Sequence, residues 1–113
     1  MDFSHKKCIP CSGSEDPLSA DKIATYMSAV PNWQHAKQDG MDTISRHLEL
    51  KNFMAVIDLV NKIATVAEDR GHHPNLHLHD YKQLDIVVYT HKIGGLHEND
   101  FILAQQIEEL LKE

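Results

Sequence analysis

The sequence predicts an α+β fold: one four-stranded antiparallel sheet with three helices packed on one face, in the order αββαββα. Three segments carry apolar residues at the helical spacing of three and four, and two pairs of short alternating segments lie between them. Each pair is joined by a short turn, and no helix crosses from one parallel strand to the next, so the sheet should be antiparallel. A chain of 113 residues suits a single domain over 1–113, with a loop-like segment over 1–17.

The first helix is predicted to begin after Ser19 and to stop by Pro31. Ser19 can cap its amino terminus, and Asp21 follows where the positive end of a helix favours an acidic side chain. One buried stripe is expected, formed by Ile23, Tyr26, Met27 and Val30.

Residues 33–37 and 43–50 alternate around the turn Gln38-Asp39-Gly40 and predict a β-hairpin. Arg46 shares the parity of the apolar residues of the second strand and interrupts a simple pattern. We expect His35 and His47 to be solvent-facing or structural, because neither belongs to a group of converging residues in the sequence.

The second helix should run from its cap Asn52 to Gly71, which suits the left-handed position that ends many helices. Its expected core face consists of Phe53, Val56, Ile57, Val60, Ile63, Ala64 and Ala67. Glu68 lies about one turn before His72 and His73, and Pro74 disfavours continuation of the helix.

A second hairpin is predicted over 76–79 and 84–90, with Asp80 at the turn and His77 and His79 exposed on one face. Gly94 and Gly95 break the chain before the third helix. Asp100 falls in the first turn of that helix, and its apolar stripe consists of Leu103, Ala104, Ile107, Leu110 and Leu111.

Composition narrows the possible roles. The formal charge of −6 and the scattered basic residues argue against direct nucleic-acid binding. No apolar run approaches the roughly 20 residues that span a bilayer, and the amino terminus lacks a signal-peptide core, so we expect a cytoplasmic protein. Cys8 and Cys11 form a single C-x-x-C, which completes neither a zinc site nor a redox motif, and we expect it to be chemically unremarkable.

His72, His73 and His91 are the candidate functional residues. Three interpretations are open: ordinary surface or core histidines, metal ligands, or acid–base groups. Adjacent histidines usually diverge, and no H-E-x-x-H pattern completes a metal site, which disfavours the second. Imidazole titrates near neutral pH, so converging histidines can supply an acid and a base together.

The spacing Glu68-x3-His72-His73-Pro74, followed by Tyr81, His91 and Asp100, resembles the signature of pterin-4a-carbinolamine dehydratases. The segment THKIGGLHENDFILA over 90–104 also resembles that family, and CIPC with the later PNW resembles its microbial and plastid-type members. The chain departs from the family at Leu76, where animal members tend to carry Trp, and at His97, where a helix-capping Thr is usual.

The resemblance implies the same α+β fold, a homodimer or homotetramer, and catalysis without metal or cofactor. The implied reaction converts a 4a-hydroxytetrahydropterin to a quinonoid dihydropterin and water in tetrahydropterin recycling. We assign catalysis to His72, His73 and His91, with His72 and His91 as the acid–base pair and His73 mainly positioning the pterin. Substrate-binding roles are expected for Glu68, which can also orient an imidazole, and for Gly71, Thr90 and Asp100, the last orienting His91 or the substrate.

One alternative is not enzymatic. Some relatives in this family also bind a homeodomain transcription factor and stabilise its dimer. No basic segment or motif of this sequence marks such a partner. The presence of the family's catalytic histidines favours an enzyme over this alternative.

Overall fold

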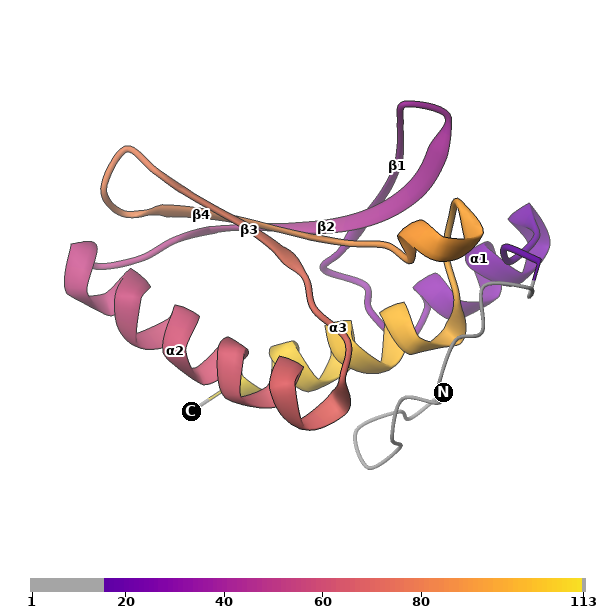
Figure 1. The fold of residues 1–113 in the computed structure, drawn as a ribbon. Coiled ribbons are helices and arrows are strands. Elements are labelled where there is room, and N and C mark those ends of the chain that lie inside the picture. The colour runs from indigo at the N-terminus through magenta and orange to yellow at the C-terminus, as the bar shows by residue number, and fades with distance from the viewer. Residues whose placement is uncertain (1–15, 113) are drawn as a thin grey trace.

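The computed structural model describes residues 16–112 and confirms the predicted fold class and element order (Figure 1). Cys8, Cys11 and almost all of the 1–17 segment lie outside the described residues. The elements are α1 (Ala20–Met27), β1 (Gln34–Gln38), β2 (Met41–Glu49), α2 (Phe53–Arg70), β3 (Asn75–His79), β4 (Gln83–Val88), the 3₁₀ turn η1 (His91–Ile93) and α3 (Glu98–Leu111).

The four strands form one antiparallel sheet in the order β1-β2-β4-β3, with β2 and β4 in the centre. Both hairpins turn through left-handed residues, Asp39 and Gly40 in the first and Asp80 and Tyr81 in the second. β4 is shorter than the predicted 84–90 strand and ends at Val88. His91 therefore does not end a strand, because Thr90 pairs with Gly95 in an isolated bridge and the residues between them form η1.

The core lies between the sheet and the helices, with α2 and α3 covering one sheet face (Figure 1). Alternation directs Ile44, Leu84, Ile86 and Val88 into this core, where all four are fully buried. α1 packs near the start of α3, with the Tyr26 and Phe101 rings in edge contact at 5.4 Å. Among the described residues, no helix is long and apolar enough to span a membrane.

Arg46, the residue that interrupted the strand pattern, faces the helices and is paired. Its Nε donates to Glu108 Oε1 at 2.7 Å, and the buried Trp33 indole donates to the same oxygen at 2.8 Å. The carboxylate thus joins α3 to β2 and to the segment before β1. A charged residue is tolerated on the core-facing side of β2 because Glu108 of the covering helix α3 pairs with it.

The predicted core face of α2 is partly wrong. Asn52 caps the helix as expected, accepting from the amide of Ala55 at 2.9 Å. The buried residues are Val56, Leu59, Ile63 and Ala67, so Leu59 was missed. Phe53 is 47% exposed and Ala64 is exposed, whereas Ile57 and Val60 are partly buried, Val60 against the core; we call these four residues of the predicted face the α2 flank: Phe53, Ile57, Val60 and Ala64. The apolar surface of α2 is wider than its contact with the rest of the chain.

Candidate active site

His72 is positioned by the end of α2. Gly71 adopts the left-handed conformation with φ of 65°, as predicted. The amide of His72 donates to the carbonyl of Ala67 at 3.1 Å, and the amide of Gly71 donates to that of Glu68 at 3.3 Å. These two bonds form the Schellman motif, which fixes the direction in which the chain leaves the helix.

Asp100 gathers three donors around a fully buried carboxylate. Its Oδ1 lies 2.6 Å from His72 Nε2, and its Oδ2 accepts from Thr90 Oγ1 and from the His97 amide, each at 2.9 Å. Because a carboxylate accepts, His72 Nε2 carries a proton, and Nδ1 is the ring nitrogen that takes no part in this contact. The contact of the Asp100 carboxylate with His72 was not predicted, and its expected role toward His91 or the substrate stays a prediction.

The same carboxylate is also a helix cap. His97 precedes α3, and its Nδ1 accepts from the amide of Asn99 at 3.0 Å while its own amide donates to Asp100. This reciprocal arrangement is a capping box, with imidazole in place of the hydroxyl usual in such boxes. Asp100 therefore caps α3 and contacts His72 through the same carboxylate, while its functional role stays a prediction.

His73 has a carboxylate partner of its own. Its Nε2 lies 2.7 Å from Glu68 Oε1, one turn back on α2. The two side chains are 59% and 78% exposed, so water screens the pair and its contribution to stability is small. The contact is consistent with the expected orienting role of Glu68, which stays a prediction.

His91 lies on the surface at the start of η1, and its ring packs edge-on against Tyr89 at a centroid distance of 6.4 Å. Thr90, the preceding residue, is bonded to Asp100, which in turn holds His72. The three candidate histidines are thus anchored separately: His72 to α3, His73 to α2 and His91 to the Thr90–Gly95 bridge.

Gly95→Ala tests whether the close contact between Gly95 and Pro17 requires a residue without a side chain in the Thr90–Gly95 bridge. An added Cβ would lie 2.9 Å from Pro17 Cβ, and Pro17 is held because the Leu18 amide donates to the Leu96 carbonyl at 2.9 Å. We expect urea unfolding to show a loss of about 1–3 kcal/mol. Pro17→Gly in the same chain removes the contacted atom and should restore most of it; an unchanged deficit would show that the crowding is not with Pro17.

A second group of titratable residues lies on the sheet face opposite α2 and α3. His47 Nδ1 contacts Asp85 Oδ1, and His79 Nε2 lies 2.9 Å from Asp85 Oδ2. The hydrogen bond from His47, with a smaller one from His79, holds the pKa of Asp85 below its usual value. A hydrogen bond to Asp80, assisted by Asp85, raises the pKa of His79.

The expectation that His47 belongs to no group of converging residues is therefore wrong. His47 and Asp85 are register partners across β2 and β4, and His79 follows two residues after His77, the partner of Asp85 on β3. The alternation of each strand was readable from the sequence, but this convergence depends on the order and register of three strands. His35 instead pairs with Asp42 at 2.8 Å in the first hairpin.

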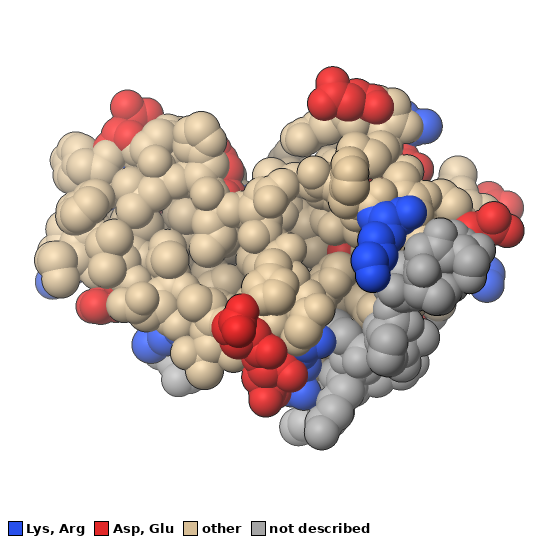
Figure 2. All heavy atoms as spheres, in the orientation of Figure 1, with Lys and Arg blue, Asp and Glu red and all other residues tan. Residues whose placement is uncertain are grey.

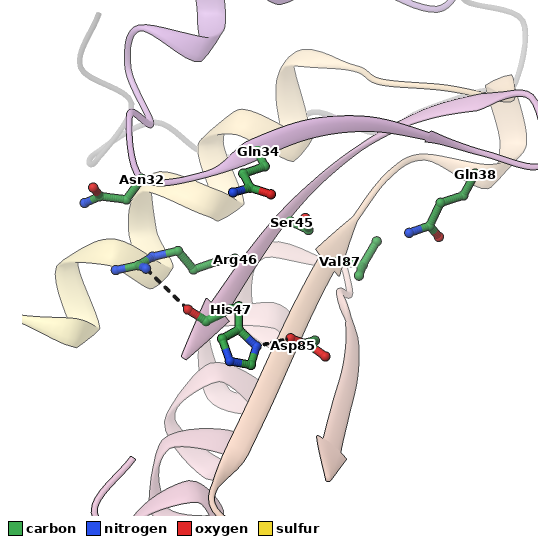
Figure 3. A pocket seen from close by; sticks show the side chains of 8 residues that line it. All are labelled: Asn32, Gln34, Gln38, Ser45, Arg46, His47, Asp85 and Val87. Atoms are coloured by element: carbon green, nitrogen blue, oxygen red, sulfur yellow. Dashed lines mark hydrogen bonds and ion pairs between the residues drawn. The ribbon is translucent and has the colours of Figure 1, made fainter. Parts of the chain in front are cut away.

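A hollow of about 330 Å³ opens on this same face, beside β1, β2 and β4 (Figure 3). None of the predicted site residues lines it; its walls are formed by Asn32, Gln34, Gln38, Ser45, Arg46, His47, Asp85 and Val87.

On the face shown in Figure 2, Lys and Arg lie in separate places and do not form a continuous patch.

A small α+β protein in which two of three candidate histidines, His72 and His73, contact carboxylates belongs to the class that can carry general acid–base chemistry. Residues 16–110 match the family model described as pterin 4 alpha carbinolamine dehydratase. The chain belongs to this family, whose members are named as dehydratases and are thus hydro-lyases.

Individual relatives agree with this assignment. The chain is 38% identical over 113 residues to "Pterin-4-alpha-carbinolamine dehydratase 2, mitochondrial" of Arabidopsis thaliana, covering 99% of this chain and 60% of that relative. A protein of Rickettsia canadensis whose name includes the same enzyme is 41% identical, with 94% of each chain covered. One from Chlorobaculum tepidum is 33% identical, with 96% of this chain and 97% of the relative covered.

Two solved structures share the fold. A transcriptional coactivator/pterin dehydratase from Brucella melitensis has a TM-score of 0.74 and 26% identity, covering 84% of this chain and 98% of that one. A pterin dehydratase-like protein identified as a RuBisCO assembly factor in the alpha-carboxysome has a TM-score of 0.58 and 14% identity, covering 70% and 88%. The second likeness concerns the fold alone.

Proposed function

We propose that this protein dehydrates 4a-hydroxytetrahydropterins to quinonoid dihydropterins, as an enzyme of tetrahydropterin recycling. The observation that carries the proposal is the buried contact between His72 and Asp100, which fixes the imidazole in one orientation and leaves one ring nitrogen for a substrate. Family membership supplies the substrate class.

The reaction breaks the bond between C4a and its hydroxyl oxygen and removes the proton on N5. The hydroxyl leaves as water after receiving a proton, and the N5 electron pair forms the C4a=N5 double bond. An acid near the oxygen and a base near N5 are therefore sufficient, and each positioned group of this kind contributes about 10²- to 10⁴-fold in rate.

We assign these two tasks to His72 and His91, which belong to different elements and can approach the reacting carbon from different sides. His73 positions the pterin, with its imidazole oriented by Glu68 at 2.7 Å. Gly71 holds the backbone that presents both His72 and His73, and Thr90 contributes the bridge that carries His91. Asp100 is a positioning residue in this scheme, because it acts through His72.

The test is turnover of chemically generated 4a-hydroxytetrahydropterin by the full chain, measured against its spontaneous dehydration. We expect acceleration that saturates with substrate and persists after exhaustive chelation, because the scheme uses imidazole groups alone. Rates equal to the spontaneous reaction would refute the proposed activity. Activity that vanishes on chelation and returns with zinc would refute the metal-free scheme.

The α2 flank favours a second proposal, self-association. Phe53, Ile57, Val60 and Ala64 recur at helical spacing on a surface that the described chain leaves partly open, and exposed apolar surface of this kind favours an interface. We propose that the protein forms a homodimer or homotetramer. Light scattering of wild type and of Phe53→Ser/Ile57→Ser should show a smaller assembly for the variant.

The Brucella melitensis structure is titled as both a coactivator and a dehydratase, so a protein-binding role is the alternative function. A stable complex with a helical regulatory peptide and no turnover would favour it over the enzyme. A cytoplasmic location stays a prediction, and the Arabidopsis relative is named as mitochondrial.

A further inference from the structure

His47, His79 and Asp85 come from three neighbouring strands and converge on the sheet face opposite α2 and α3; we call them the three-strand cluster. One ligand atom from each lies within 4.8 Å of the other two. Bond lengths of about 2.0–2.1 Å place neighbouring ligands of a tetrahedral zinc ion about 3.4 Å apart. Small side-chain rotations would therefore bring all three atoms to metal-binding distance.

One ring nitrogen of each histidine in the cluster is directed at the carboxylate of Asp85. Asp85 offers one oxygen to each imidazole, Oδ1 to His47 and Oδ2 to His79. The other ring nitrogen of His79 lies 2.9 Å from Asp80 Oδ2. A carboxylate behind a histidine is the usual outer support of a metal ligand, because it fixes the ring and its tautomer.

The surroundings leave room for the remaining ligands. Figure 3 shows His47 and Asp85 directed at one another beside the hollow, so water can reach the cluster. His77 lies on the same strand face, with its ring 5.2 Å from that of His79. The nearby positive charge of Arg46 is offset by Glu108, which binds its Nε at 2.7 Å.

We propose that the three-strand cluster binds a divalent transition-metal ion of the zinc type. Two imidazoles and one carboxylate form a donor set that suits ions of the zinc type. Mg²⁺ and Ca²⁺ favour oxygen ligands alone and fit this set less well. Because the ligands come from β2, β3 and β4, the ion joins three strands and stabilises the sheet. This site shares no residue with the proposed catalytic group, so the inference stands independently of the dehydratase proposal.

The experiment titrates Zn²⁺ into the full chain by calorimetry at neutral pH, with Cys8→Ser and Cys11→Ser present in every protein to remove thiol ligands. We expect one bound ion and a higher Tm with Zn²⁺ present. His47→Ala/His79→Ala should weaken binding at least about 100-fold and abolish the rise in Tm, since two of three ligands are lost. Asp80→Asn should weaken binding about 10-fold, as expected for an outer support.

His35→Ala is the matched control, because it removes another strand histidine that is paired with a single aspartate. Its affinity for Zn²⁺ should equal that of the parent. Circular dichroism without metal checks that each variant folds, and Co²⁺ absorption reports the ligand set. The proposal is overturned if the parent binds no Zn²⁺, if His47→Ala/His79→Ala binds as tightly as the parent, or if binding is lost instead in His72→Ala/His73→Ala.

Discussion

Replacing Asp100 by asparagine should lower kcat about 10²- to 10⁴-fold on at least one 4a-hydroxyl stereoisomer while the fold persists. An asparagine oxygen in the place of Oδ2 can still accept from Thr90 and from the His97 amide. The amide nitrogen then faces His72 Nε2, which must become an acceptor, so the proton moves to the nitrogen that would serve the substrate. The variant thus keeps the helix cap but presents the wrong tautomer of His72.

Two comparisons separate this effect from a structural one. Asp100→Ala leaves three donors without an acceptor in a buried place and should cost about 3 kcal/mol or more in urea unfolding, whereas Asp100→Asn should cost much less. Glu98→Gln removes another acidic charge from the first turn of α3 and should leave kcat near that of wild type. A folded Asp100→Asn with wild-type kcat and an unchanged pH profile would contradict the positioning role.

The double variant His72→Ala/His91→Ala should fall to near the uncatalysed rate, the largest loss that we expect from any pair of residues. Each single variant should lower kcat more than it raises KM, because transition-state interactions are lost, and each histidine can serve one stereoisomer. His73→Ala should act mainly on KM. Steady-state kinetics on the separated stereoisomers measures all four proteins.

Folding must be checked for the double variant, because His72 is 14% exposed and removing it leaves Asp100 Oδ1 without its donor. We expect a loss of about 1–3 kcal/mol, with circular dichroism unchanged at low temperature. His35→Ala/His77→Ala removes two histidines elsewhere in the sheet and should keep wild-type kcat. Turnover at the wild-type rate by a folded His72→Ala/His91→Ala would refute the assignment of the acid–base pair.

The fold was predictable because its signals are local. Ser19 and Asn52 cap their helices as predicted, and Gly71 ends α2 in the left-handed conformation that its position indicated. The errors arose where packing between elements decides the outcome. Helical spacing could not tell that Leu59 would be buried and Ala64 exposed, because both lie at the margins of one broad apolar surface.

The contacts of the candidate site could not be predicted from the sequence, and its membership stays a prediction. The sequence brought attention to Glu68, His72 and Asp100, yet the bond from His72 to Asp100 joins residues 28 positions apart on different helix ends. The three-strand cluster was missed for the same reason: alternation places a histidine on a face, and only strand register decides what stands beside it.

The capping box at the start of α3 links fraying of that helix end to the position of His72. The His97 amide stays bonded only while the Asp100 carboxylate is in place, and that same carboxylate holds His72. Opening the first turn of α3 would therefore release the His72 imidazole from Asp100. Hydrogen exchange at the His97 amide reports this opening directly. The free energy of opening sets the fraction of molecules that hold His72 in place at a given temperature.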